Sequence, residues 1–231
     1  MRLLIDLFCG RGGWAKGFIA EGYDVIGFDI ERQPYPGQLV LQDVMTLHGS
    51  QFMNSSVIVG SPPCQAYSYR AMPWKRAKAL PPPSNELFNA CFRIQREACE
   101  TAGHHIPMVV ENVKGAQPWV GRAKWHYGSY YLWGDVPALM PWTQGRKGAT
   151  GSWFFAADKR GDPREARRYS LRSESIKMHG SGAAWFDQGF TKFPSRSERR
   201  KHASAVIAEI PFPLARYIAS VFRDYRQDGD R

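Results

Sequence analysis

The chain has 231 residues, of which 43% are hydrophobic, and carries a formal net charge of +10 at pH 7. A chain of this length and hydrophobic content can bury a full core and form one domain, with or without a small appendage, so disulfides are not needed for stability. A charge this positive predicts an anionic partner, and nucleic acid is the commonest of these.

The positive charge is concentrated in one part of the chain. Residues 143–202 contain fourteen Lys and Arg against six Asp and Glu, a net charge of +8, with aromatic residues interleaved. This pattern is typical of a nucleic-acid surface, and a solvated charged face explains it equally well. We expect a compact basic region at residues 143–196, between an α/β core at 1–142 and closing helices at 197–231 that pack back on the core.

The four cysteines indicate a reduced, intracellular protein. Cys9, Cys64, Cys91 and Cys99 show no C-x-x-C pair and no spacing typical of metal ligands, so we expect no bound metal. No stretch approaches the roughly 20 apolar residues that cross a bilayer, so we expect no membrane partner. The chain enters a strand-like run at once, which favours a cytoplasmic location.

The first part of the chain has the order strand, glycine turn, helix and strand. Residues 2–8 and 23–29 are strand candidates, 9–13 form the turn, and 14–21 have helical composition. Such a turn lets backbone N–H groups approach a ligand at the start of a helix. Asp29 ends the second strand, where a carboxylate commonly binds the ribose of a nucleoside-type cofactor.

Three further strands are expected at residues 38–42, 57–60 and 107–110. Two prolines hold open the loop after the second of these strands, and Cys64 lies in that loop. Glu111 follows the strand at 107–110. Ligands of open parallel sheets bind beyond the carboxyl ends of the strands, so we expect Cys64 and Glu111 to face one crevice. Taken alone, Cys64 would be an ordinary half-buried thiol.

The rest of the chain adds helices and further strands. Helices are expected at residues 86–102, 197–207 and 213–224, and the alternating aromatic and small residues at 125–133 predict further strands. Strands that alternate with helices indicate an α/β fold with a parallel sheet.

Four motifs then stand in order within residues 1–115 and together resemble the cytosine-C5 DNA methyltransferase family, which uses S-adenosyl-L-methionine. They are D-L-F-C-G-R-G-G from Asp6, F-D-I-E from Phe28, P-P-C-Q from Pro62 with Ser68, and E-N-V from Glu111. The resemblance implies a class I S-adenosylmethionine-dependent methyltransferase fold, a Rossmann-like, doubly wound and mostly parallel sheet with a small irregular recognition region. The short, solitary form resembles family members carried by bacteriophages and prophages.

The resemblance implies a role for each matched residue. Cys64 would be the nucleophile that adds to C6 of cytosine, and Glu111 would hold a proton toward N3. The implied cofactor contacts are Phe8, Gly10 and Gly12 at the methionine end, Asp29 at the ribose, Ile30, Asp43 and Val44 at the adenine, and Pro63 near the methyl group. Gln65, the last residue of the P-P-C-Q motif, and Ser68, three residues later, are implied nucleic-acid contacts.

The implied partner is double-stranded DNA, bound by a monomer, with the target base swung out of the stack. The family's Q-x-R-x-R strand has no clear match; Arg122 and Lys124 come nearest, and residues 144–146 are a rival. The Gly-Asn that normally precedes the closing motif at 210–215 is replaced by Ile207-Ala208. Two other functions stay open: an RNA cytosine-C5 methyltransferase, and a nucleic-acid-binding relative that has lost turnover.

Overall fold

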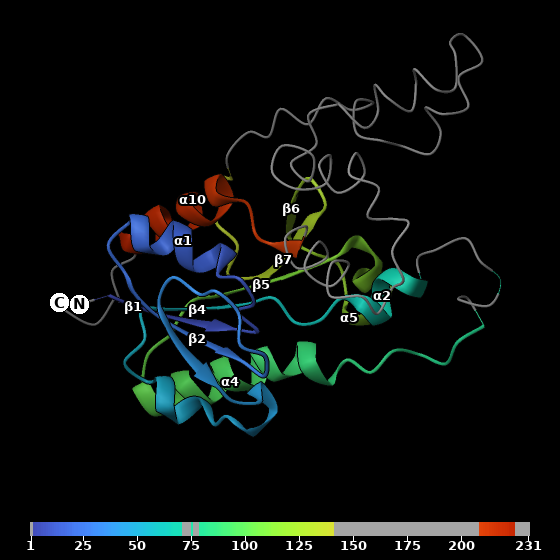
Figure 1. Ribbon diagram of the computed structural model, residues 1–231, viewed down its shortest axis with the longest axis horizontal. Coiled ribbons are helices and arrows are strands. Elements are labelled where there is room, and N and C mark those ends of the chain that lie inside the picture. Colours follow the sequence, from blue (N-terminus) through green and yellow to red (C-terminus); the bar gives the residue numbers. More distant parts are fainter. Residues whose placement is uncertain (1, 71–74, 76–78, 141–207, 225–231) are drawn as a thin grey trace, which may run out of the picture. The chain divides into compact units, whose positions relative to one another are not determined.

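A seven-stranded sheet, ordered β3-β2-β1-β4-β5-β7-β6, forms the centre of the fold (Figure 1). The computed structural model describes residues 2–70, 75, 79–140 and 208–224. From β1 the chain builds outward through β2 and β3 and then returns to β4 on the other side. This reversal confirms the predicted doubly wound sheet. The strands are β1 (Leu3–Leu7), β2 (Asp24–Asp29), β3 (Gln38–Leu41), β4 (Val57–Gly60), β5 (Met108–Asn112), β6 (Trp125–Tyr127) and β7 (Tyr130–Gly134).

The sheet is mostly parallel, as predicted. Strands β1 to β5 pair in parallel, whereas β7 runs antiparallel to β5 and β6 antiparallel to β7. The hairpin of β6 and β7 extends β5 beyond its predicted end. We expected Glu111 to follow the strand, but Glu111 and Asn112 pair with β7 and therefore belong to β5.

Helices cover both faces of the sheet (Figure 1). One face carries α1 (Gly13–Ala20) and α10 (Phe212–Arg223), and the other carries α4 (Glu86–Ala102). Two short helical turns, η1 (Val44–Thr46) and η2 (Gly49–Phe52), pack beside α4. The remaining short elements follow the strand ends: α2 (Gln65–Arg70), η3 (Lys114–Ala116) and α5 (Gln117–Val120).

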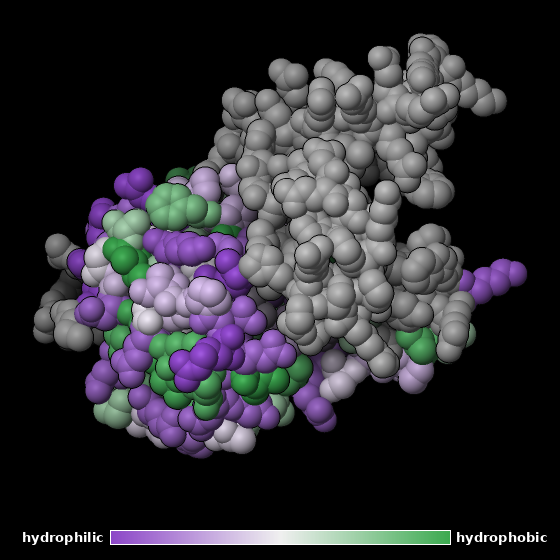
Figure 2. All heavy atoms as spheres, in the orientation of Figure 1, coloured by the Kyte–Doolittle hydropathy of each residue, from purple (hydrophilic) through white to green (hydrophobic). Residues whose placement is uncertain are grey.

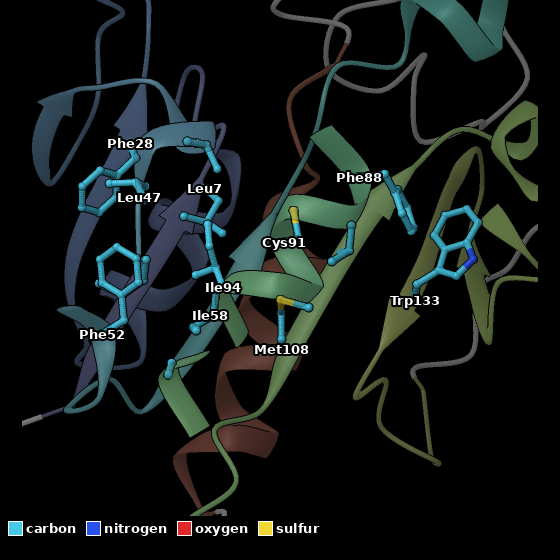
Figure 3. Packing of buried hydrophobic residues seen from close by; sticks show 14 of the residues in the cluster. Leu7, Phe28, Leu47, Phe52, Ile58, Phe88, Cys91, Ile94, Met108 and Trp133 are labelled. Carbon is cyan, nitrogen blue, oxygen red and sulfur yellow. The ribbon is translucent and has the colours of Figure 1, made fainter. Parts of the chain in front are cut away.

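The main apolar core lies between the sheet and α4 (Figure 3). Leu7, Ile58 and Met108 extend from three neighbouring strands toward Cys91 and Ile94 of the helix, and all five side chains are buried. Parallel strands that are covered on both faces need apolar residues at successive positions, which explains the uninterrupted Val57-Ile58-Val59 run. The core therefore holds β1, β4 and β5 together against α4.

On the opposite face, α1 and α10 approach each other closely. A Cβ added to Gly17 would lie 2.4 Å from the backbone nitrogen of Arg216, so only glycine allows this contact. Glu21 adds two ion pairs, at 2.7 Å from Arg216 and 2.6 Å from Arg223. The phenol of Tyr23 donates to the carbonyl oxygen of Ala219 over 3.3 Å. These contacts join residues that lie about two hundred positions apart in sequence.

The chain divides into two units, Met1–Pro141 with Ile210–Arg231, and Trp142–Glu209. The predicted basic region and the helix expected at 197–207 lie outside the described residues, so the domain boundaries stay predictions. The helix expected at 213–224 is α10. No helix in the described residues has both the length and the apolar character needed to cross a bilayer. The coloured surface in Figure 2 is mainly hydrophilic, with small hydrophobic patches.

Candidate active site

The topology brings Cys64 and Glu111 to the same edge of the sheet. Strands β4 and β5 are parallel neighbours in which Gly60 pairs with Val110. Glu111 is the next residue of β5, and Cys64 lies in the loop that leaves β4. Glu111 is only 9% exposed, and Cys64 is half-buried. Both residues thus sit where ligands of open α/β sheets bind.

The loop that carries Cys64 is anchored on both sides. The backbone N–H of Ser61 donates to the carbonyl oxygen of Leu7 at 3.1 Å, which ties the loop to β1. The side-chain amide of Asn112 donates to the carbonyl oxygen of Pro62 at 3.0 Å, which ties it to β5. Asn112 is fully buried, so its polar groups need these partners. The bond therefore fixes the Cys64 loop against the strand that holds Glu111.

After Cys64 the chain forms α2, which is also anchored by hydrogen bonds. The carbonyl oxygen of Cys64 accepts from the backbone N–H of Ser68 at 2.9 Å. Tyr67 donates its hydroxyl to Asn85, and the amide of Asn85 donates to the carbonyl oxygen of Trp119, both over 2.9 Å. Gln65 is exposed and Ser68 half-buried at this side of the loop.

The strands beside Glu111 carry apolar residues. Leu132 in β7 pairs with both Glu111 and Trp125, so the three residues share one face of the sheet. Arg122 and Lys124 precede β6 and are exposed. The backbone N–H of Lys124 donates to the carbonyl oxygen of Leu132 at 2.9 Å, which ties the residue before β6 to β7.

The glycine turn between β1 and α1 lies next to the Cys64 loop. Phe8, Gly10 and Gly12 have positive φ angles of 56°, 49° and 74°. A Cβ on Gly10 would meet no atom within 4 Å, so this side of the turn is open. Asp29 accepts the backbone N–H of Gly10 through Oδ2 and that of Glu31 through Oδ1, both at 2.9 Å. The carboxylate therefore fixes the open turn against the end of β2.

The residues predicted to surround adenine lie at the ends of β2 and β3. Ile30 is 71% exposed, which is high for a large apolar side chain and suits a site that a flat aromatic ring would cover. Asp43 caps η1 by accepting the backbone N–H of Met45 at 2.9 Å. Val44, the first residue of η1, is buried. Pro63 is exposed in the Cys64 loop.

Taken together, the open glycine turn, the carboxylate of Asp29 and the exposed Ile30 fit a nucleoside with an amino-acid tail. A backbone turn with a free approach at Gly10 suits the tail, and an acidic residue at the end of β2 suits ribose hydroxyls. Among the described residues, no group of three or more His, Cys, Asp or Glu could hold a metal ion.

Sequence reasoning missed a buried polar pair beneath the turn. Asp6 is fully buried, and its Oδ2 accepts the hydroxyl of Tyr35 at 3.0 Å. Burial raises the pKa of Asp6 well above its ordinary value; the bond from Tyr35 opposes this rise, and the nearby Asp29 adds to it. The available signal was the aspartate inside an otherwise apolar strand, but nothing near it in sequence indicated Tyr35 as its partner.

Residues 3–117 match the family model of C-5 cytosine-specific DNA methylases. This part of the chain belongs to that family. A curated relative, the type II methyltransferase M.FnuDI of Fusobacterium nucleatum, is 26% identical over 120 residues, which cover 48% of this chain and 32% of the relative. The chain thus matches about a third of the length of that relative.

Two solved structures are similar over nearly the whole chain. The Entamoeba histolytica methyltransferase EhMeth has a TM-score of 0.53 and 13% identity, and the alignment covers 98% of this chain and 99% of that one. The S. pombe Dnmt2 methyltransferase has a TM-score of 0.51 and 11% identity, with coverage of 96% and 98%. At such identities the likeness shows the fold, which is the class I S-adenosylmethionine-dependent methyltransferase fold.

Proposed function

We propose that the protein is a DNA (cytosine-5-)-methyltransferase that moves a methyl group from S-adenosyl-L-methionine to C5 of a flipped-out cytosine. The observation that carries the proposal is the bond from Asn112 to Pro62, which holds the Cys64 loop against the strand of Glu111. A nucleophile and a proton donor that act on one base must be held together, and this bond supplies that rigidity.

The proposed chemistry begins with the thiolate of Cys64, which adds to C6 of cytosine. The new S–C6 bond breaks the C5=C6 double bond, and C5 becomes the nucleophilic carbon of an enamine. Glu111 holds a proton at N3 and so offsets the negative charge that builds on the ring. Bound S-adenosyl-L-methionine supplies an electrophilic methyl group. Once C5 is methylated, its proton leaves to a base and Cys64 departs by elimination, which restores the double bond.

Three groups of residues have proposed binding roles. Phe8, Gly10 and Gly12 bind the methionine end of the cofactor, with Asp29 at the ribose and Pro63 near the methyl group. Ile30 covers the adenine, and Asp43 and Val44 meet its edge. Gln65, Ser68, Arg122 and Lys124 contact double-stranded DNA. A base inside a duplex cannot reach Cys64, so the target must leave the stack. The proposed setting is a monomer in the cytoplasm of a bacterial or phage-infected cell.

The first experiment measures tritium transfer from labelled S-adenosyl-L-methionine to duplex DNA. We expect transfer by the parent protein and none by Cys64→Ser, because an alcohol is far too weak a nucleophile to add to C6. Equal labelling of DNA by the parent and by Cys64→Ser would contradict the role of Cys64. No labelling by the parent, together with cofactor binding in calorimetry, would favour the relative that has lost turnover.

A second experiment traps the covalent adduct. Fluorine at C5 of cytosine replaces the proton that must leave, so a duplex with 5-fluorocytosine should remain bound through Cys64 and migrate as a shifted band under denaturing conditions. A parallel competition between duplex DNA and folded RNA for methyl transfer identifies the substrate. A preference for RNA would indicate that the protein is an RNA cytosine-C5 methyltransferase that uses the same chemistry.

A further inference from the structure

A hydrogen bond joins the cofactor side of the fold to the nucleophile side. The indole Nε1–H of Trp14 donates to Oγ of Ser61 over 3.0 Å. Trp14 is the second residue of α1, directly after the glycine turn, and Ser61 is the first residue after β4, at the start of the Cys64 loop. The bond therefore joins the start of α1 directly to the start of the Cys64 loop.

Both partners of this bond are held in place independently. Trp14 is 2% exposed and packs edge-on against Phe18, with 6.5 Å between ring centroids and 70° between ring planes. The backbone N–H of Ser61 donates to the carbonyl oxygen of Leu7, just before the glycine turn. A buried indole N–H without an acceptor is costly, so Trp14 and Ser61 stay together. A shift of α1 would move the Cys64 loop with it.

The geometry points to Trp14 and Ser61 as positioning residues for methyl transfer. This inference rests on the proposed function, in which the donor lies at the glycine turn and the acceptor base is bonded to Cys64. Reacting atoms must come within about 3–3.5 Å, and a misplacement of about 1 Å can lower the rate roughly 100-fold. The bond between α1 and the loop keeps these two positions in register. Neither residue touches the reacting atoms.

The test uses the full chain and four variants. Trp14→Phe keeps an aromatic ring but lacks the N–H donor, Ser61→Ala lacks the acceptor, and the double variant lacks both. Trp133→Phe is the matched control, because the buried Trp133 donates its own Nε1–H to the carbonyl oxygen of Gly121 at 3.0 Å, a bond that involves neither α1 nor the Cys64 loop. Duplex DNA with 5-fluorocytosine first titrates the active sites in each preparation, so that every rate is expressed per folded enzyme.

Single-turnover methyl transfer at saturating DNA and cofactor is then measured. We expect Trp14→Phe and Ser61→Ala each to lower the rate constant roughly 10-fold to 100-fold, because the loops lose their register. The double variant should match the single variants, since both remove the same bond. Affinity for S-adenosyl-L-methionine should change less than about 3-fold, because no cofactor contact is removed. Trp133→Phe should keep the parental rate constant.

Two outcomes separate this inference from the proposed function. Parental rate constants per active site in both Trp14→Phe and Ser61→Ala would overturn the positioning role and leave the methyltransferase proposal intact. Fully additive losses would also overturn it, because independent effects do not arise from one shared bond. Absence of both transfer and trapping in the parent protein would overturn the proposed function and this inference together.

Discussion

Cys64 and two other cysteines carry the same thiol in different surroundings. Cys64 is half-buried, whereas Cys9 and Cys91 are buried. Burial raises the pKa of Cys91 to about 12, and burial together with the charges of Asp6 and Asp29 raises that of Cys9 further above its ordinary value. The thiolate is the reactive form, so the two buried thiols are poorly suited to nucleophilic chemistry.

Alkylation should therefore separate these cysteines. We expect iodoacetamide at pH 8 to modify Cys64 in the folded protein, with Cys9 and Cys91 protected both by exclusion from solvent and by a pKa well above the pH. Peptide mass spectrometry gives the extent at each site, and labelling in urea shows that all sites can react once unfolded. Faster labelling of Cys91 than of Cys64 in the folded protein would contradict this picture.

Asp6 makes stability depend on pH. Its pKa is raised in the folded protein, so the folded state retains a proton that the unfolded chain loses near pH 3.9. The stabilisation is complete below that pH and is lost as the pH rises through the folded pKa. The slope within this window is at most about 1.4 kcal/mol per pH unit for one proton.

Asp6→Asn should remove this dependence, because an amide of nearly the same shape carries no charge and still accepts from Tyr35. We expect the free energy of unfolding of the parent to fall relative to that of Asp6→Asn as the pH rises from 4 to 8. Urea unfolding at each pH provides the measurement. A constant difference between the two proteins over this range would refute a raised pKa at Asp6.

At the scale of elements, the contact of α1 with α10 is set by a single missing side chain. Helix propensity alone favours alanine over glycine by about 1 kcal/mol inside a helix. At Gly17, however, a Cβ would lie 2.4 to 2.5 Å from backbone and side-chain atoms of Ala215 and Arg216. The backbone cannot move aside as a flexible side chain can. The energetic cost of the steric overlap therefore exceeds the gain in helix propensity.

Gly17→Ala should consequently destabilise the protein by roughly 1–3 kcal/mol, the usual cost of overpacking. The measurement is the midpoint of urea unfolding, and Ala20→Gly at an exposed position of the same helix is the control. The free energy of unfolding of this control should fall by no more than about 1 kcal/mol, because only helix propensity changes. A gain of stability in Gly17→Ala would mean that α10 does not pack against α1 as described.

Elements built from local pattern could be predicted from the sequence, and elements set by distant partners could not. The apolar run at 57–60 and the glycine turn near Gly10 indicated β4 and the start of α1, because strand and turn signals are local. The end of β5 was wrong by two residues, since Glu111 and Asn112 become strand only through pairing with β7. For the site, motif residues were identifiable, whereas the supports from Trp14 and Asn112 depend on contacts about fifty positions away.

At the scale of the molecule, charge dominates the expected interaction with DNA. The net charge of +10 is concentrated in residues 143–202, and Arg122 and Lys124 are exposed cations in the described part of the chain. Each phosphate that a protein neutralises contributes about −0.9 to the slope of log affinity against log salt concentration. Affinity for duplex DNA should therefore fall steeply as salt increases.

The double variant Arg122→Ala with Lys124→Ala tests these two contacts. If each neutralises one phosphate, the salt slope should become shallower by about 1.8. Fluorescence anisotropy of a labelled duplex between 50 and 200 mM salt gives the slope, and Arg96→Ala in α4 serves as the control with an exposed arginine. A slope equal to that of the parent would remove both residues from the DNA contacts.

The pairing of α1 with α10 also governs when the protein can finish folding during synthesis. Helix α1 leaves the ribosome before α10, so the apolar surface that α10 buries stays uncovered until about two hundred further residues have been translated. At about 5–20 residues per second, this delay is on the order of tens of seconds. A nascent chain with an uncovered apolar face is a substrate for chaperones. The yield of soluble protein should therefore increase when chaperones are co-expressed with it.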